Sequence, residues 1–580
     1  MLTETIALPR TQTRTTRPPT GRPELDQIVA RLQEGAAAFA RLSLTDRIAL
    51  ARAMQAGYLR IAEQSVRAGC EAKAIPPGTP MEGEEWATGP WSVIRQLRLV
   101  VESLESLARA GNTPIGPVGW TGDGRLTARV FPANRVDQVL FSGIVVDVRF
   151  QAGIDQDRMH ASRASHYKGP SHPGRTVLVL GAGNIAAIPP MDVITKLFNE
   201  GKVCLLKMNP VNAYLGPYID AAFAEPIRRG FLAVVYGGPE EGSYLAQHAG
   251  IDEIHLTGSD RTYDQIVWGP PGPEREARKA RNAPVIAKPV TAELGNVSPV
   301  LVVPGPYSDR ELAFQAESIA GAVAMNASFL CNSPKMLITP KGWNGRASLL
   351  AALERAFALA PVRRAYYPGA EERWRELAGG RPRNKTIGTA GPGQLPWTII
   401  PGLDATDSRE RAFSTEPFCS IVSETEVGSD DPVEFLERAV EFANNRLWGT
   451  LSADLVIHPK AMKDPRIAEA AERAIARLRY GAVGVNSWAG FVFPYATPPW
   501  GAYPGSTPAD IQSGTGWVHN TAMLEGIEKA VLRHPITIRP KPASFPSHRT
   551  AHTLLRRLTS LEERASWARV PGVVAAAMRG

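Results

Sequence analysis

The chain has 580 residues, 44% of them apolar, and its 65 basic residues exceed its 57 acidic ones by a formal net charge of +8. That length exceeds a single compact core and predicts about three domains. The basic excess is thinly spread, and the one dense run, Arg275 to Arg281, contains Glu276. We therefore expect a solvated loop or helix end there and no nucleic-acid surface.

The four cysteines form no C-x-x-C pair and no zinc-type spacing, so we expect reduced thiols, a cytoplasmic protein and no bound metal. No apolar run reaches the roughly 18 residues that a membrane span needs, and no signal peptide is apparent. Residues 1–22 are expected to form a disordered tail.

The first part of the chain is predicted to be helical from Glu24 to Gly69 and again from Val93 to Ala110, with a capping signal at Ser43 to Asp46. Alternating apolar residues from Leu126 to Phe150 then indicate a pair of strands.

An α/β unit follows. A fully apolar strand, Thr176 to Leu180, precedes Gly181-Ala-Gly183-Asn184-Ile-Ala186, and helices and strands then alternate, including a helix from Tyr218 to Arg228. Glycine turns at the strand ends predict a parallel sheet that binds its ligand at the carboxyl edge. The spacing G-x-G-x-x-A matches a dinucleotide fingerprint, although Lys207 occupies the end of the next strand, where that fingerprint has an acid.

Cys331 lies between an apolar helical run and the β-rich run that begins at Met336, so it is expected at a helix-to-strand junction. Such junctions present side chains to clefts. A thiol is useful there only if it can ionise with a base and an oxyanion partner nearby. Glu293, between two extended runs, is the candidate base. A small buried hydrophobe is the alternative interpretation of Cys331.

Together, the segments around Cys331 and Glu293 resemble the catalytic signatures of the aldehyde dehydrogenase superfamily. The resemblance covers roughly Glu24 to Pro540. It implies an α/β fold with a Rossmann-like cofactor-binding domain (23–292), interrupted by a small β oligomerisation hairpin (125–150). A catalytic α/β domain (293–500) and a C-terminal return (501–580) would follow, in a homodimer or homotetramer.

The same resemblance implies roles for single residues. Asn184 would stabilise the oxyanion, Lys207 would hold the adenosine ribose, and Glu416 would hold the nicotinamide ribose with Phe418 beside the ring. The other cofactor-binding positions implied are Gly183, Gly258, Ser259 and Leu294. Departures from the family pattern are Gly183 itself, Pro210, Tyr263, Ser-Phe-Leu before Cys331, and Cys419.

The resemblance implies NAD or NADP-dependent oxidation of an aldehyde to a carboxylic acid. A CoA-acylating relative and a non-catalytic binding protein are the alternatives. Glu293 argues against the first, because acylation needs no base for water, and Cys331 argues against the second.

For the C-terminal part we predict a helix from Ala522 to Val531, a strand-like Ile536 to Ile538 that crosses to a partner subunit, and an Arg-rich helical tail. His548 and His552 are expected to be surface residues.

Overall fold

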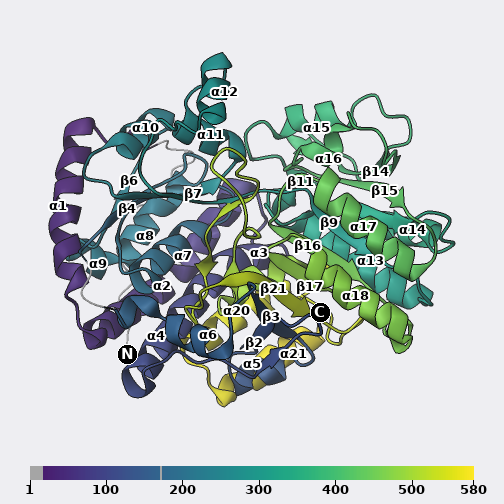
Figure 1. Ribbon diagram of the computed structural model, residues 1–580, viewed down its shortest axis with the longest axis horizontal. Helices are drawn as coiled ribbons and strands as arrows, with labels where there is room; N and C mark the ends of the chain where they lie inside the picture. The colour runs from purple at the N-terminus through teal and green to yellow at the C-terminus, as the bar shows by residue number, and fades with distance from the viewer. Residues whose placement is uncertain (1–16, 170–172) are drawn as a thin grey trace.

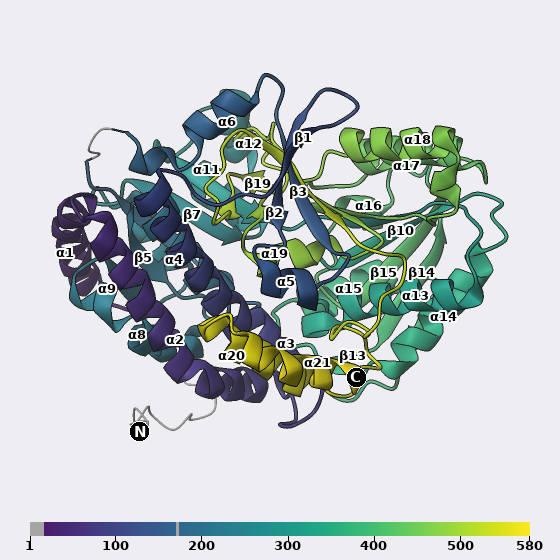
Figure 2. The same ribbon diagram turned by 90° about the horizontal axis from the view of Figure 1, so that it is seen from below.

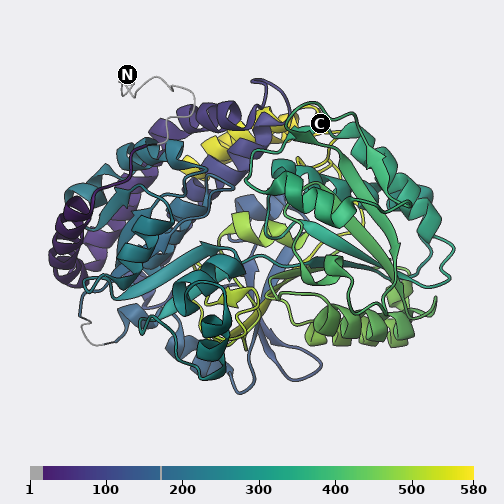
Figure 3. The same ribbon diagram turned by 90° about the horizontal axis from the view of Figure 1, so that it is seen from above.

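The computed structural model describes residues 17–169 and 173–580, so most of the expected N-terminal tail lies outside the described residues. Helix α1 (Arg22–Ala40) already includes the last residue assigned to that tail. Two sheets organise the molecule, one in each half (Figure 1, Figure 3). Their α/β architecture agrees with the expected fold class.

The N-terminal helices pack against the smaller sheet. After α1 come α2 (Leu44–Lys73) and α4 (Ser92–Ala110), as predicted. The Ser43 side chain caps α2 by accepting a hydrogen bond from the backbone N–H of Asp46. Gly111 ends α4 in the left-handed conformation, with φ of 72°.

The smaller sheet has six strands in the order β19-β8-β7-β4-β5-β6. All are parallel except the edge strand β19, which pairs antiparallel with β8. Their bounds are β4 (Thr176–Leu180), β5 (Val203–Lys207), β6 (Leu232–Val235), β7 (Glu253–Gly258), β8 (Val290–Leu294) and β19 (Gly514–Thr515). Because β4 to β8 are parallel, their carboxyl ends share one edge.

One helix beside this sheet differs from expectation. The predicted helix from Tyr218 to Arg228 consists of α8 (Gly216–Ala222) and α9 (Ala224–Arg228), broken at Phe223. Pro226 has no N–H to donate to the carbonyl of Ala222, and its ring would clash there, so one continuous helix cannot form.

The larger sheet has eleven strands in the order β1-β2-β3-β21-β17-β16-β9-β10-β15-β14-β12, and those from β21 to β14 run parallel. The bounds are β1 (Val118–Trp120), β2 (Leu126–Phe131), β3 (Val145–Phe150), β9 (Ser298–Val302), β10 (Pro334–Pro340), β12 (Lys385–Ile387), β14 (Trp397–Leu403), β15 (Ile421–Val427), β16 (Ser452–Val456), β17 (Ala482–Val485) and β21 (Ile527–Arg533).

Helices cover both faces of this sheet (Figure 2). Val300 and Val302 of β9 share a cluster with residues of α13 (Asp309–Ala324) and α14 (Arg346–Leu359). Leu301, between them, packs with residues of α17 (Pro432–Arg446) and α18 (Pro465–Arg477). This alternation is the two-residue period of a strand buried on both faces.

The segment from Leu126 to Phe150 does contain two strands, β2 and β3, joined by helix α5 (Arg135–Leu140). The predicted helix from Ala522 to Val531 is wrong, since its second half belongs to β21 and its first half is not helical. Ile536 to Ile538 is not a strand. β21 lies between β3 and β17, which supply backbone partners on both sides, and its apolar residues are buried on both faces.

The tail beyond β21 is helical, as predicted. Helix α20 (Ala551–Glu563) lies beside α3 (Glu82–Trp86), and α21 (Val570–Met578) packs on α20 (Figure 2). Glu562 of α20 forms buried ion pairs with Arg95 (2.9 Å) and Arg98 (2.7 Å) of α4. His548 precedes α20 and is 1% exposed, so its expected surface position is wrong.

The proline-rich insertion after Trp268 forms a surface helix, α12 (Pro273–Ala280). Its basic side chains are paired with acids, because Arg275 and Lys279 both contact Asp264, at 3.7 and 2.6 Å. Among the described residues, no helix has both the length and the apolar character to cross a bilayer.

Candidate active site

Cys331 lies where the sequence predicts, between the end of α13 and the start of β10. The turn before it, Met325 to Ser328, places Asn326, Ala327 and Ser328 in the left-handed region, with φ of 51°, 55° and 69°. A non-glycine residue there costs roughly 1 to 2 kcal/mol. Strain of this kind persists only where the surroundings hold it, and it clusters at functional sites.

Asn326 holds this turn. Its Nδ2 donates to the carbonyl oxygens of Asn184 (2.9 Å) and Phe329 (3.0 Å). Its Oδ1 accepts from Lys73 Nζ (2.9 Å) and from the Tyr366 hydroxyl (3.0 Å). The role of Asn326 was not predicted from the sequence. The local indication of a left-handed turn was an asparagine, a residue type that tolerates this region, five residues before the thiol.

Two acidic residues of α3 support the same turn, and sequence reasoning missed them as well. Glu84 accepts from the backbone N–H of Asn326 (3.0 Å) and pairs with Arg363 at 3.0 Å. Glu85 pairs with the buried Lys73 at 2.7 Å. Both glutamates precede Cys331 by more than 240 positions, so the sequence contains no local signal for these contacts.

Glu293 is buried near the end of β8, its Oε1 has no hydrogen-bond partner among the described residues, and its charge acts on the pKa of the Cys331 thiol. Burial raises the pKa of Glu293 to about 8. Burial also raises the pKa of Cys331 well above its usual value, and the charges of Glu293 and Glu416 act in the same direction. Both effects favour the protonated thiol, and Glu293 is placed to receive its proton.

Asn184 follows β4 and is buried. Its Nδ2 donates to the carbonyl oxygen of Phe329 at 3.0 Å, two residues before Cys331. An amide nitrogen has two N–H groups, so one remains for another acceptor. Asn184 and Cys331 line the same cavity. The structure thus brings Cys331, Glu293 and Asn184 together from three separate parts of the chain.

A small chamber of about 40 Å³ lies beside Glu293, and both polar and apolar side chains line it. His255 Nδ1 is 2.9 Å from Thr291 Oγ1, and Lys196 Nζ is 2.6 Å from Glu200 Oε1. A polar space larger than about 15 Å³ accommodates a water molecule. A water there would lie beside the Glu293 carboxyl.

The predicted cofactor residues lie along the carboxyl edge of the smaller sheet. Lys207 ends β5 and donates from Nζ to the carbonyl oxygen of Gly237 at 2.7 Å. Gly258 ends β7, and Ser259 caps α11 (Asp260–Trp268) by accepting from the backbone N–H of Thr262. The helix N-terminus at Ser259 directs backbone N–H groups to the same edge, which suits an anion.

No family model matches the chain. A curated geranial dehydrogenase of Castellaniella defragrans is 26% identical over 384 residues, covering 62% of this chain and 72% of that protein. The fold is similar to that of an NADP-dependent glyceraldehyde-3-phosphate dehydrogenase from Bacillus halodurans, solved with NADP, at a TM-score of 0.60 and 16% identity, covering 89% of this chain and 92% of the other. It is also similar to an aldehyde dehydrogenase from Pseudomonas syringae, solved with NAD+ and octanal, at a TM-score of 0.58 and 18% identity over 88% of each chain.

The chain resembles aldehyde dehydrogenases in sequence and shares the fold of the solved ones. The family implies a dinucleotide, and the residues at the sheet edge fit one. A Cβ on Gly183 would come within 2.6 Å of Asn209 Oδ1, so only glycine fits where the backbone turns beside the expected pyrophosphate.

The surroundings of Glu416 also suit the cofactor of an aldehyde dehydrogenase. Its Oε1 is buried without a hydrogen-bond partner among the described residues, and a Cβ on Gly295 would lie 2.0 Å from Oε2. Burial raises the pKa of Glu416 to about 8, against the opposing charges of Lys335 and Arg373. A buried carboxyl oxygen without a partner suits a ribose hydroxyl.

Phe418 and Leu294, two further predicted cofactor residues, differ in their surroundings. The Phe418 ring lies 5.0 Å from Tyr367 and 5.8 Å from Phe329, in an aromatic cluster beside the Cys331 turn. Leu294 is fully buried and exposes no surface.

Proposed function

We propose that this protein oxidises an aldehyde to a carboxylic acid with NAD or NADP, using Cys331 as nucleophile, Glu293 as base and Asn184 as oxyanion donor. The observation that carries the proposal is the buried, unpartnered Glu293 carboxyl oxygen near the Cys331 thiol, together with a cavity that Cys331 and Asn184 both line. A nucleophile beside a base, with an amide donor close by, is the arrangement that acyl-transfer chemistry requires.

In the first step the Sγ of Cys331 forms a bond to the aldehyde carbon while Glu293 takes the thiol proton. The carbonyl oxygen becomes an oxyanion, which the free N–H of Asn184 and the backbone N–H of Cys331 stabilise. Removing one such donor typically costs about 3 to 4 kcal/mol of transition-state stabilisation. A bound nicotinamide supplies the hydride acceptor.

Once hydride has left that carbon a thioester remains, and Glu293 releases the thiol proton to solvent. In the second step Glu293 takes a proton from water, whose oxygen attacks the thioester carbon. The carbon–sulfur bond breaks, Glu293 returns its proton to the sulfur, the carboxylic acid leaves, and the Cys331 thiol is restored. The chamber beside Glu293 supports this role because it has room for the water.

The residues that would hold the cofactor are Lys207 at the adenosine ribose, Gly183, Gly258 and Ser259 near the phosphates, and Glu416 at the nicotinamide ribose. Arg275 and Lys279 of α12 are paired with Asp264, so they offer no free charge to a 2′-phosphate. We expect both cofactors to be used, with a preference for NADP, because Lys207 and Pro210 stand where many relatives would place an acid.

The proposal also covers location, assembly and domain organisation. The protein would be a cytoplasmic homodimer or homotetramer assembled through the β hairpin. Its cofactor-binding domain would span 23–292, its catalytic domain 293–500 and its C-terminal return 501–580. Reduced thiols support the location, because none of the four cysteines forms a disulfide. A CoA-acylating enzyme is less consistent with Glu293, which that reaction does not need.

The test is a panel of aldehydes assayed by absorbance of reduced cofactor, with NAD and with NADP, with and without CoA. Cys331→Ala should abolish turnover while cofactor binding stays intact. Cys419→Ala is the matched control, because Cys419 is the other thiol beside a family motif. Normal turnover in Cys331→Ala together with loss in Cys419→Ala would overturn the assignment of the nucleophile.

A further inference from the structure

A cavity of about 360 Å³ runs from Cys331 to the C-terminal helices. Its wall at the thiol is made by Leu330, Ile185, Ile188 and Trp488. The Trp488 Nε1 donates to the carbonyl oxygen of Asn332 at 2.7 Å, so its ring presents only apolar surface to the space. A reacting aldehyde carbon at Cys331 therefore has its substituent directed along an apolar passage.

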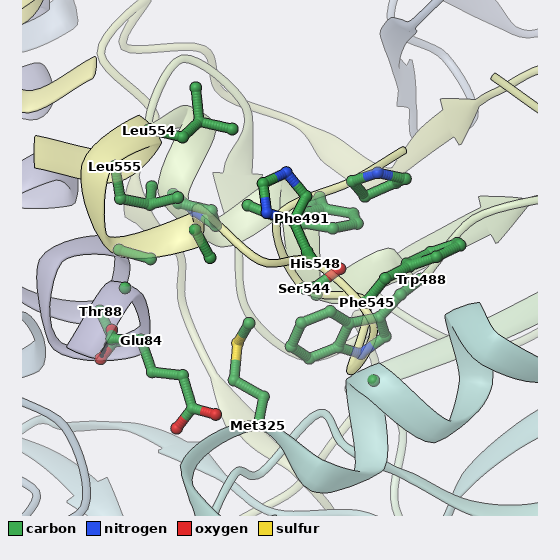
Figure 4. A pocket seen from close by; sticks show the side chains of 18 of the residues that line it. Glu84, Thr88, Met325, Trp488, Phe491, Ser544, Phe545, His548, Leu554 and Leu555 are labelled. Atoms are coloured by element: carbon green, nitrogen blue, oxygen red, sulfur yellow. Dashed lines mark hydrogen bonds between the residues drawn. The ribbon is translucent and has the colours of Figure 1, made fainter. Parts of the chain in front are cut away.

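The far wall comes from the last part of the chain, residues 541–580, which we call the C-terminal segment. Figure 4 shows Leu554 and Leu555 of α20 and Phe545 before it around the same space as Met325 and Phe491. Leu558, Val573 and Ala577 complete this side.

The C-terminal segment is fixed in this position. A Cβ on Gly83 would lie 2.8 Å from the backbone of Ala551, so α20 packs directly on α3. The buried ion pairs of Glu562 with Arg95 and Arg98 anchor its other end. The far wall is therefore part of the folded molecule, held against the helices that precede the active site.

The polar groups in the wall near the centre are paired or neutral. Glu84 pairs with Arg363, and the Thr88 hydroxyl donates to the carbonyl oxygen of Glu84. His548 accepts from the backbone N–H of Thr550, and burial lowers its pKa to about 4, so it is uncharged at neutral pH. A charged substrate would lose its hydration here without gaining a free counter-charge.

Two cations also line the cavity. Lys541 donates from Nζ to Ser547, at 3.0 Å to its carbonyl oxygen and 2.8 Å to its hydroxyl. Arg539 is exposed, and it is the group that would attract an aldehyde with an anionic far end. The two substrate classes are therefore distinguishable by experiment.

We propose that the substrate is an elongated, uncharged, apolar aldehyde and that the C-terminal segment sets the length it accommodates. This inference rests on the proposed aldehyde oxidation at Cys331. The cavity volume lies at the lower end of the range of small-molecule pockets, roughly 300 to 1,000 Å³, and its lining is mostly apolar.

The first experiment measures kcat/KM for straight-chain aldehydes from acetaldehyde to dodecanal. We expect a rise of about fourfold per added methylene, the factor equivalent to about 0.8 kcal/mol per buried CH₂, until the cavity is filled. Aldehydes of equal length with a terminal carboxylate should be at least tenfold poorer. A flat series, or a preference for the carboxylate compounds, would overturn the proposal.

The second experiment uses paired variants of α20. Leu555 lines the cavity and is 5% exposed, whereas Leu561 is 3% exposed and packs against Val136 and Val570 instead. Leu555→Ala should move the optimum to a longer aldehyde, and Leu561→Ala should leave it unchanged despite a similar loss of buried surface. The same shift in both variants would show a general loosening and contradict the proposal.

A binding measurement separates this inference from the proposed reaction. Isothermal titration calorimetry of the Cys331→Ala variant measures the binding of decanol to the cavity without turnover. We expect decanol to bind, and we expect Leu555→Ala to alter this binding and Leu561→Ala to leave it unchanged. Decanol binding without oxidation of any aldehyde would refute the reaction and leave the cavity assignment standing. Aldehyde oxidation without decanol binding or length dependence would refute the cavity assignment alone.

Discussion

Replacing Asn326 by alanine tests the support of the Cys331 turn. The change removes hydrogen bonds to the carbonyl oxygens of Asn184 and Phe329, to the Tyr366 hydroxyl, and to the ammonium group of Lys73. A neutral hydrogen bond contributes about 1 kcal/mol net and one to a charged group about 1.5 to 3. We expect a loss of about 4.5 to 6 kcal/mol in the free energy of unfolding.

Turnover should fall with stability, because the turn positions both Cys331 and the Asn184 backbone. Alanine also tolerates the left-handed conformation less well than asparagine does. We expect a thermal midpoint lowered by several degrees and kcat reduced by more than tenfold, with faster alkylation of Cys331 by iodoacetamide as the turn loosens.

The matched control is Asn384→Ala. The Asn384 amide makes one hydrogen bond, to the carbonyl oxygen of Ala378 at 2.6 Å, far from Cys331 in the sequence. It should cost about 1 kcal/mol and leave kcat unchanged. If Asn326→Ala matches this control in midpoint and keeps turnover within twofold of the parent, the support assigned to Asn326 is wrong.

Three further predictions concern the chemistry. Glu293→Gln should stall after hydride transfer, giving one equivalent of reduced cofactor and a trapped thioester; a slowed first turnover without that burst would instead assign Glu293 to thiol activation alone. The rate should rise with pH between about 7 and 9, because the pKa of Glu293 is raised to about 8 and the carboxyl acts as a base only once it has lost its proton; a flat profile over that range would argue against this environment. Comparison of kcat/KM for the two cofactors should favour NADP, and a hundredfold preference for NAD, equivalent to about 2.7 kcal/mol, would show that an unassigned acid reaches the ribose.

Several features followed from local pattern. The apolar run from Thr176 to Leu180 forms a central strand, and the Ser43 side chain caps α2, because both depend on residues within a few positions of each other. The junction at Cys331 was also predictable, since an apolar helical period changes there to a β-rich run.

Other features depended on distant partners. The segment of β21 fits a helical pattern in isolation, and it is a strand because β3 and β17 supply hydrogen bonds on both sides. The sequence around His548 indicates a surface residue, but α20 and the end of the chain bury its side chain in the folded protein.

The sequence by itself determined the α/β class, the order of the chemical groups and the candidates Cys331 and Glu293, because these depend on short-range periodicity and residue type. The tertiary structure alone decided that burial favours the protonated thiol of Cys331, that Asn326 holds its turn, and that the C-terminal segment closes the cavity. Burial, charge proximity and cavity shape depend on groups hundreds of positions apart, and a one-dimensional pattern does not contain their distances.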